Sequence, residues 1–283
     1  MKKTDIISLA SALAISGAQG ALVDGLVNYW PLNDNLNDAA HGVAGSASTV
    51  SDSGTFAGAN GIDGISYAPG VFGSGTLQNG AAGGAAGAEN DGFVSIASSD
   101  DTRFGGESLT TSLWLQVGTF DTGWQSAISH GEGSAYRIAR RGTTTELGYA
   151  GGIGEGAVNG LDVTSGWHHV VSITEHNVGT RLWIDGVLTA STVTNVATAI
   201  VDNELDLNIG GNPATGAQNR EWNGNIDDVA QWNRVLTDQE ISSIYGGGAQ
   251  SAASLGSLIA VPEPGSTALL ALAGLGLLRR KRR

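Results

Sequence analysis

The sequence Arg181-Leu182-Trp183-Ile184-Asp185-Gly186-Val187-Leu188-Thr189-Ala190 encodes a β-hairpin. Asp185-Gly186 separates two runs of strand-forming residues, and both positions of a two-residue hairpin turn need the positive φ that Asp and Gly adopt readily. This pattern is one of the strongest short-range signals for paired antiparallel strands. We therefore expect the chain to build a β-sheet around it.

Similar strand candidates recur along most of the chain. Within residues 108–117, Leu113, Leu115 and Val117 point to one face of a strand while Trp114 points to the other. Many short strands with almost no helical periodicity predict an all-β fold, a two-sheet antiparallel sandwich. The strand candidates are residues 26–30, 93–97, 108–117, 125–130, 136–140, 146–150, 168–174, 180–184, 187–191, 205–209 and 227–232.

One short helix is expected after the last strand. Thr237-Asp238-Gln239-Glu240 has the pattern of a capping box, Ile241 and Ile244 share one helical face, and Gly246 suits the helix end. Residues 248–260 are rich in Gly, Ala and Ser and are expected to be a linker.

The composition fits one large β-domain at residues 21–247. The chain has 283 residues with 44 glycines, 5 prolines and no cysteine, which excludes disulfides, thiolate metal sites and cysteine nucleophiles. A domain of this length can bury a sizeable core without such cross-links. The glycine- and alanine-rich run at residues 80–88 is expected to be a loop.

The N-terminus is typical of a secretory signal peptide. Lys2 and Lys3 precede an apolar run at residues 6–15, and Ala18-Gln19-Gly20 offers small residues at the positions that a signal peptidase reads. We expect residues 1–20 to be removed on export.

The C-terminus at residues 261–283 has three zones. Pro262-Glu263-Pro264 disfavours regular pairing, a short uncharged apolar run follows, and five basic residues stand at 279–283. As a helix the apolar run rises only ~21 Å, against a hydrocarbon core of ~30 Å. A basic cluster beside an apolar segment stays cytoplasmic. The tail is therefore expected to be a short transmembrane helix that anchors the protein temporarily, with the domain outside the cytoplasm.

This ending resembles the PEP-CTERM sorting signal of Gram-negative bacteria. The resemblance implies that an exosortase-type membrane protease cuts near Pro262, Glu263 and Pro264, and that the protein passes from the inner membrane to the cell envelope or extracellular matrix. Without its two ends, the chain at residues 21–264 keeps seven arginines, no lysine and 26 acids, a net charge of −19. Such a domain repels nucleic acid and anionic membranes, so only the tail is expected to meet the membrane.

Four groups of motifs follow one another along the predicted domain. They are Gly25-Leu26-Val27-Asn28-Tyr29-Trp30-Pro31-Leu32-Asn33-Asp34, Ser112-Leu113-Trp114-Leu115, Gly166-Trp167-His168-His169-Val170-Val171 with Leu182-Trp183-Ile184-Asp185-Gly186, and Trp222-Asn223-Gly224-Asn225-Ile226-Asp227-Asp228-Val229. The last of these runs on into Trp232-Asn233-Arg234-Val235-Leu236-Thr237. In this order and spacing the set resembles the LamG-like jelly roll of the concanavalin A-like lectin/glucanase superfamily. The resemblance implies a two-sheet jelly roll across the mature domain. Residues 44–90 fit the family least and are expected to form an expanded loop or hairpin.

Two acidic patterns match part of a glucanase active site. Retaining glucanases of the superfamily carry Glu-x-Asp-x-x-Glu on one strand, and their two catalytic carboxyls lie ~5–5.5 Å apart. Glu204-Leu205-Asp206 begins such a pattern, but Ile209 stands where the second glutamate is needed. Glu89-Asn90-Asp91 meets Val94 in the same way. We therefore expect no enzymatic activity and assign no catalytic residue.

Trp167-His168-His169 could be read as a metal or acid/base site. Adjacent residues on a strand face opposite sides, so the two imidazoles cannot easily share one ion. In the LamG-like family that the chain resembles, this segment is structural. Trp114 and Trp183 are likewise expected to be core residues and not sugar platforms.

A structural calcium site is expected where the terminal strands meet. Asn33-Asp34-Asn35-Leu36-Asn37-Asp38 follows the first strand, and Asp227-Asp228 opens the last. Calcium takes about six to eight oxygen ligands, and the terminal strands pair in the resembling jelly rolls. Asp34 or Asp38 with Asp227 or Asp228 would then hold the ion. The alternative is a solvated turn in which Asn and Asp bond their own backbone.

Aromatic rings beside polar groups are the expected elements of a glycan site. Trp124 and Trp222 are the aromatic candidates, and Arg137, Arg140 and Arg141 are candidates for contacts with acidic sugars.

Together these features predict an exported, non-catalytic binding module of the bacterial surface or extracellular matrix that recognises carbohydrate or a matrix polymer. The alternatives are a purely structural matrix protein without a specific ligand, and a degenerate glycoside hydrolase.

Overall fold

The predicted hairpin is formed by β12 (Gly179–Ile184) and β13 (Val187–Val193). Asp185 and Gly186 both have positive φ, at 52° and 75°. The turn also lies against α3 (Asp238–Tyr245), because a Cβ added at Gly186 would stand 2.7 Å from Cδ1 of Tyr245. Glycine at this position therefore satisfies both the turn and its packing.

The computed structural model describes residues 22–58, 65–73, 76–79, 92–152, 157–158, 161–193, 199–214 and 220–259. Three predicted features lie outside these ranges: the signal peptide at 1–20, the loop at 80–88, and the sorting tail at 261–283 with Pro262, Glu263 and Pro264. In the ranges that are described, no helix has the length and apolar character needed to cross a membrane.

The hairpin belongs to an eight-stranded antiparallel sheet. In spatial order this sheet contains β13, β12, β11 (Trp167–Glu175), β6 (Leu109–Val117), β15 (Gly224–Trp232), β4 (Thr76–Asn79) and β3 (Ile65–Ala68), and β1 (Leu26–Trp30) also pairs with β15. The first and last strands of the domain are thus neighbours, with Trp30 opposite Val229.

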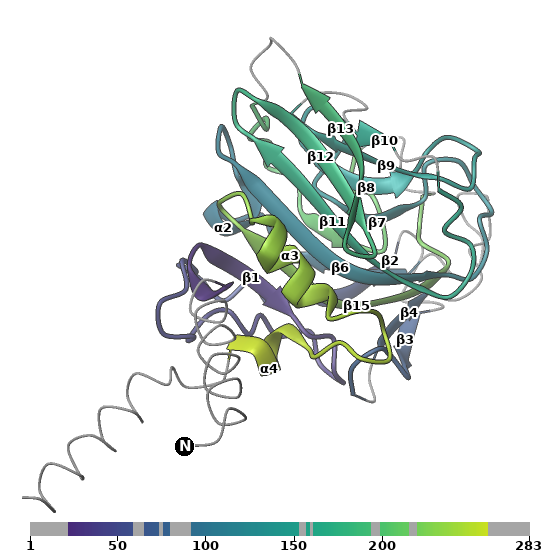
Figure 1. Ribbon diagram of the computed structural model, residues 1–283, viewed down its shortest axis with the longest axis horizontal. Coiled ribbons are helices and arrows are strands. Elements are labelled where there is room, and N and C mark those ends of the chain that lie inside the picture. The colour runs from purple at the N-terminus through teal and green to yellow at the C-terminus, as the bar shows by residue number, and fades with distance from the viewer. Residues whose placement is uncertain are drawn as a thin grey trace, which may run out of the picture.

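The second sheet has seven antiparallel strands. In spatial order these are β10 (Ala157–Val158), β9 (Leu147–Gly151), β8 (Tyr136–Arg140), β7 (Ser126–Ser129), β14 (Leu207–Ile209), β5 (Gly92–Ile96) and β2 (Thr55–Gly58). The two sheets pack face to face (Figure 1). This arrangement confirms the predicted two-sheet jelly-roll sandwich.

The main core fills the space between the sheets. Leu113, Leu115 and Val117 of β6 join it, together with Leu207 and Ile209 of β14. Alternate residues of β6 face away from this core, as the period of two predicts. Burial of each of these apolar side chains stabilises the fold by roughly 1.5–3 kcal/mol relative to leaving the side chain exposed.

A second cluster, which we call the outer cluster, covers the other face of the eight-stranded sheet. It consists of Leu22, Leu26, Tyr29, Ala40, Val171, Ile173, Trp183, Ala230, Trp232, Leu236, Ile241, Ile244 and Leu255. Two helices, α3 and α4 (Leu255–Ile259), lie over this face (Figure 1). The C-terminal part of the domain therefore covers part of the outer face of the eight-stranded sheet.

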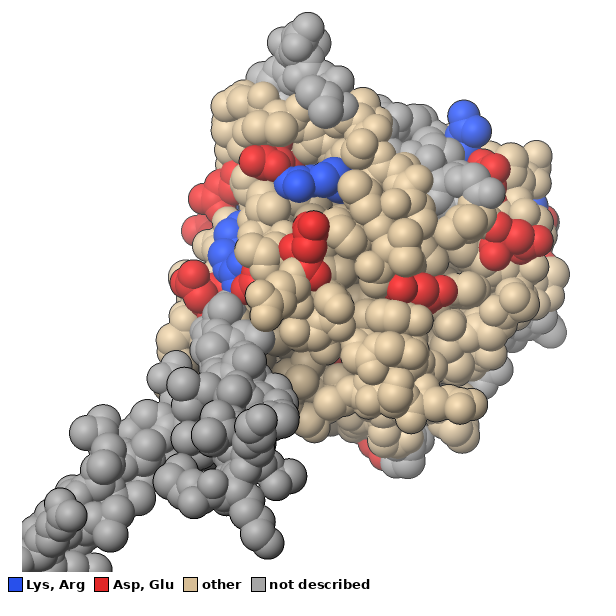
Figure 2. Space-filling view, viewed as in Figure 1, with Lys and Arg blue, Asp and Glu red and all other residues tan. Residues whose placement is uncertain are grey.

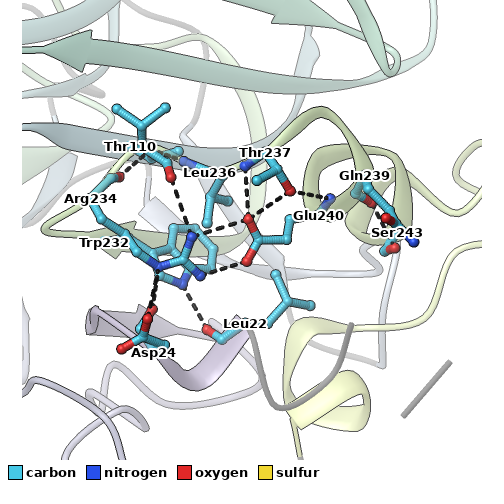
Figure 3. A network of polar contacts seen from close by, with 11 residues as sticks. Leu22, Asp24, Thr110, Trp232, Arg234, Leu236, Thr237, Gln239, Glu240 and Ser243 are labelled. Atoms are coloured by element: carbon cyan, nitrogen blue, oxygen red, sulfur yellow. Dashed lines mark hydrogen bonds and ion pairs between the residues drawn. The ribbon is translucent and has the colours of Figure 1, made fainter. Parts of the chain in front are cut away.

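The α3 helix begins with the predicted capping box. The Thr237 side chain accepts a hydrogen bond from Glu240 N, and the Glu240 carboxylate accepts from Thr237 N at 2.7 Å. The same carboxylate pairs with Arg234 at 2.6 Å, and Arg234 Nε donates to Asp24 O at 2.6 Å (Figure 3). This network ties the start of α3 to the segment before β1.

Several elements differ from the sequence-based expectation. In the region 44–90, β3 pairs with β4 as a hairpin, which is one of the two predicted alternatives, but β2 is an additional strand at the edge of the seven-stranded sheet. The short β10 and α2 (Asp100–Arg103) are additional to the predicted elements. The linker predicted at 248–260 is wrong in its C-terminal part, because α4 forms there and Leu255 is buried. The folded domain therefore extends past residue 247 to Ile259.

We expect Gly186→Ala to destabilise the domain more than Gly166→Ala. Both glycines have positive φ, 75° and 81°, where an alanine costs roughly 1–2 kcal/mol. A Cβ at Gly166 meets no atom within 4 Å, whereas one at Gly186 collides with Tyr245 and adds roughly 1–3 kcal/mol. Denaturant unfolding measures the difference. Equal losses in the two variants would contradict the close packing of the hairpin turn on α3.

Candidate functional site

An open pocket lies on the outer face of the seven-stranded sheet, where β5 and β14 pair. Its cavity volume is about 400 Å³, and its lining residues are Phe93, Ser95, Glu204, Leu205, Asp206, Asn208, Asn212 and Pro213. The strand residues of this lining alternate with core residues, Val94 and Ile96 in β5 and Leu207 and Ile209 in β14. Strand alternation therefore places Phe93, Ser95 and Asn208 on the outer face.

The pocket floor continues as a row of polar residues across the sheet. Ser95 is the register partner of Asn208, Asn208 of Ser129, and Ser129 of Arg137. Asn208 is only 2% exposed, and its Oδ1 atom is buried without a hydrogen-bond partner. A buried amide oxygen without a partner is a costly feature of the fold.

One wall of the pocket is the segment before β14. Asn203 fixes this segment, because its Nδ2 donates to His130 O at 2.9 Å and its Oδ1 accepts from Leu205 N at 3.0 Å. The Asp206 carboxylate accepts from Ser95 Oγ at 3.0 Å and from Ser98 N at 3.2 Å. Glu204 and Asp206 are both exposed, so this wall presents negative charge to solvent.

Another lining residue, Asn212, links the pocket to a cluster of charged groups. Asn212 Nδ2 donates to Glu132 Oε1 at 3.3 Å, and Glu132 pairs with both Arg137 and Arg220. The Arg137 guanidinium lies over the Trp124 ring, 5.0 Å from its centroid. The structure thus brings two of the predicted ligand-binding residues, Trp124 and Arg137, together next to the pocket.

The other predicted ligand-binding residues lie elsewhere. Trp222, an aromatic candidate for the glycan site, is 1% exposed, packs in the main core and donates from Nε1 to Gln116 O at 3.2 Å. Arg140 is also buried, and its guanidinium donates to the carbonyl oxygens of Thr122, Thr143 and Thr144. Both side chains are therefore engaged in the fold. Arg141 is exposed and forms an ion pair with Glu146 at 3.8 Å.

Of the acids in the two glucanase-like patterns, one pair lines the pocket and the other pair lies outside the described residues. Glu204 and Asp206 line the pocket, but Ile209 is buried in the main core, so no carboxylate stands at the third position of the pattern. Glu89 and Asp91 lie outside the described residues.

The adjacent histidines face opposite sides of β11, as predicted. His168 Nδ1 contacts Asp185 Oδ2 at 2.8 Å, and this hydrogen bond raises the His168 pKa. His169 lies on the other side, where its Nε2 contacts Ser112 Oγ at 2.9 Å, and burial lowers its pKa to about 4. No Ser-His-Asp triad results, because serine and aspartate contact different histidines.

The four acids predicted to bind calcium are spread around the paired terminal strands. Asp38 Oδ1 accepts from Tyr29 N at 2.9 Å, whereas Asp228 Oδ1 accepts from Tyr29 OH at 2.5 Å. Asp227 Oδ2 accepts from Phe72 N at 3.0 Å, and Asp34 is exposed. Within the described residues, no three His, Cys, Asp or Glu side chains form a group that could hold a metal ion.

The buried carboxyls of the last strand differ from ordinary surface acids. Burial raises the pKa of Asp227 to about 7 and that of Asp228 to about 6. One oxygen of Asp227 and one of Asp38 are buried without a partner. These two oxygens are the features that support a cation here, and the scattered positions of the four acids speak against one shared site.

The surface charge is dispersed on the face that carries α3 and α4. Figure 2 shows acidic side chains scattered over this face, with fewer basic ones between them and no continuous basic patch.

Two family models match the sequence. One, described as the concanavalin A-like lectin/glucanases superfamily, matches residues 88–242, which is more than half of the chain. The other, the PEP-CTERM protein-sorting motif, matches residues 260–283. No curated protein sequence matches the chain significantly.

Several solved structures share the fold at low sequence identity. The binding domain of Paraclostridial Mosquitocidal Protein 1 aligns with a TM-score of 0.57 and 15% identity, over 80% of this chain and 52% of that one. Domain 4 of AbnA, a GH43 extracellular arabinanase from Geobacillus stearothermophilus in complex with arabinotriose, aligns with a TM-score of 0.53 and 16% identity, over 77% and 96%. A botulinum neurotoxin type C structure, described through its interaction with two ganglioside molecules, aligns with a TM-score of 0.55 and 13% identity, over 80% and 52%. The chain thus spans about half the length of the matched toxin chains, and these similarities show the fold alone.

The residues of the pocket floor were not predicted from the sequence. Strand alternation was the signal that could have found them, because Phe93, Ser95 and Asn208 stand at the outward positions of two predicted strands. Only the pairing of β5 with β14 makes them neighbours.

Calcium binding remains a prediction that a thermal melt can test. If Asp34 or Asp38 with Asp227 or Asp228 holds calcium, excess EDTA should lower the melting temperature and added calcium should restore it, because an ion that binds only the folded state stabilises it. A melting temperature unmoved by EDTA would contradict the site.

His130, whose carbonyl fixes the pocket wall, should make the stability depend on pH. Burial lowers its pKa to about 4, and both ring nitrogens are buried without partners. The unfolded state binds a proton below pH ~6.5 while the folded state does so only near pH 4, so stability is full above pH ~6.5 and falls as the pH drops to 4. The loss is at most about 3 kcal/mol.

The variant His130→Phe should remove this part of the pH dependence. A phenyl ring can keep the stack on Tyr136, whose centroid is 5.3 Å away, and it cannot titrate. Urea unfolding of both proteins at pH 7.5, 5.5 and 4.5 measures the effect. Parallel pH curves for the two proteins would contradict the buried neutral imidazole.

Proposed function

The chain belongs to the concanavalin A-like lectin/glucanase superfamily, and we propose that it is an exported, non-catalytic module that binds carbohydrate. The observation that carries the proposal is the pocket on the outer face of the seven-stranded sheet. This pocket combines the Phe93 side chain with carboxylate and amide groups on its walls and floor. Sugar sites in proteins use this combination, because an aromatic ring packs on the apolar face of a sugar and polar groups bind its hydroxyls.

The chemistry of the pocket favours neutral sugars. Glu204 and Asp206 repel a carboxylated or sulfated ligand and accept hydrogen bonds from hydroxyls. The nearby arginines already serve the protein, since Arg137 pairs with Glu132 and Arg140 binds backbone carbonyls. We therefore replace the expectation of contacts with acidic sugars by a preference for a neutral, hydroxyl-rich glycan.

The sorting motif supplies the cellular setting. It indicates export and membrane-associated sorting in a Gram-negative bacterium. An exosortase-type protease would cut near Pro262-Glu263-Pro264 and release the domain to the cell envelope or the extracellular matrix. There a glycan-binding domain would attach to exopolysaccharide. Two of the structural neighbours are described with arabinotriose and with gangliosides, which supports a carbohydrate ligand for this fold.

A degenerate hydrolase is less well supported than a binding module. A retaining glycosidase needs two catalytic carboxyl groups flanking the scissile bond. Ile209 replaces the acid that would complete the pattern begun by Glu204 and Asp206. A structural matrix protein without a specific ligand stays the main alternative, and it would leave the pocket without a role.

A glycan array followed by calorimetry tests the proposal. The purified protein should bind neutral oligosaccharides and leave them uncleaved, and it should discriminate against acidic ones. Glu204→Ala should weaken binding by roughly tenfold, because a charge-assisted hydrogen bond contributes about 1.5–3 kcal/mol. Phe93→Ala should weaken it further through loss of the ring.

The matched control is Glu107→Ala, which removes an exposed acid outside the pocket. Its affinity should equal that of the wild type. Absence of any neutral glycan among the ligands, or equal affinity of the Glu204 variant and the wild type, would refute the assignment of this pocket.

A further inference from the structure

The α4 helix is attached to β1 and β15, the first and last strands of the domain. Tyr29 OH, on β1, donates to Asp228 Oδ1, on β15, at 2.5 Å. Leu255 N donates to Asp228 Oδ2 at 2.9 Å, and Gly256 N donates to Tyr29 OH at 2.9 Å. The first N–H groups of a helix have no partner inside it. One tyrosine and one carboxylate of the folded domain therefore satisfy the start of α4.

Packing reinforces these hydrogen bonds. Leu255 is 1% exposed within the outer cluster, and Leu258 and Ile259 pack against the same cluster. A Cβ at Gly256 would stand 3.2 Å from the Tyr29 hydroxyl, so glycine permits this close approach. The helix is thus held by one buried leucine and by a fitted backbone contact.

The position of α4 in the sequence connects it with processing. The helix ends at Ile259, the sorting motif starts at residue 260, and Pro262 is the third residue after the helix. A protease that binds the residues before its cleavage site in extended form must also engage part of α4. Cleavage of a docked segment depends on the population of its locally open state.

We propose that α4 is a latch that limits processing at the sorting motif. The protease cuts from the state in which Leu255–Ile259 has left the domain, and the contacts of Tyr29, Asp228 and Leu255 set the population of that state. This inference rests on the proposed processing of residues 260–283. It adds that the folded domain itself controls how fast the protein leaves the membrane.

The test measures the processing rate of the full chain by pulse-chase in a host that carries an exosortase-type protease. Leu255→Asn should be cut roughly tenfold faster than the wild type, because the open state becomes more populated. Tyr29→Phe should also be cut faster, since it removes the acceptor of Gly256 N. Ala253→Asn places the same new side chain at an exposed position near the helix and should keep the wild-type rate.

Hydrogen exchange on the purified chain shows whether α4 has undocked. The amides of Leu255 and Gly256 should lose protection in the Leu255 and Tyr29 variants while the amides of β6 stay protected. Lost protection together with an unchanged or slower cleavage rate would overturn the latch.

A spacer variant separates this failure from a failure of the sorting role. About eight Gly and Ser residues inserted after Ile259 give the protease an extended segment without undocking, so this variant should be cut fast whether or not Leu255 is substituted. If the spacer variant and every other variant stay uncut, the sorting role is wrong and the latch falls with it.

Discussion

The pairing of β1 with β15 is the constraint on which the rest of the domain depends. It pairs Tyr29 with Ala230 and also brings the Tyr29 hydroxyl to the Asp228 carboxylate, 199 positions away in the sequence. A register shift in β15 lies between Asp227 and Ala230, where Asp228 adopts a positive φ of 52°. This irregularity lets Asp228 reach both the Tyr29 hydroxyl and α4. The junction of the first and last strands, the outer cluster around it and the attachment of the C-terminal helix thus involve one pair of strands.

The two outer faces of the sandwich are covered differently. On the eight-stranded sheet, α3 and α4 cover the outer cluster, and the aromatic groups of Trp114, His169 and Tyr245 stack within this layer. On the seven-stranded sheet, the paired strands β5 and β14 present polar residues and a pocket to solvent. One face is used to complete the fold, and the other is available for a ligand.

Local patterns predicted most of the fold. The Asp185-Gly186 turn, the alternation in β6 and the capping box of α3 each act over a few residues, so the sequence alone reveals them. The candidate site was harder, because its floor is made by β5 and β14, which pair across more than a hundred residues. The sequence favours Trp222 as a candidate for the glycan site because its polar neighbours give no sign that its ring enters the core. The α4 helix was not predicted because its segment is rich in Gly, Ala and Ser. Its docking depends on partners in the distant strands β1 and β15.

We propose that this superfamily member binds a neutral glycan on the open face of its seven-stranded sheet. A titration of the isotope-labelled protein with a neutral oligosaccharide, followed by amide and side-chain NMR, tests it most directly. We expect saturable chemical-shift changes centred on Phe93, Asn208 and Asn212, with little change at the outer cluster. Shifts centred on any other surface, or none across a set of neutral oligosaccharides, would contradict it.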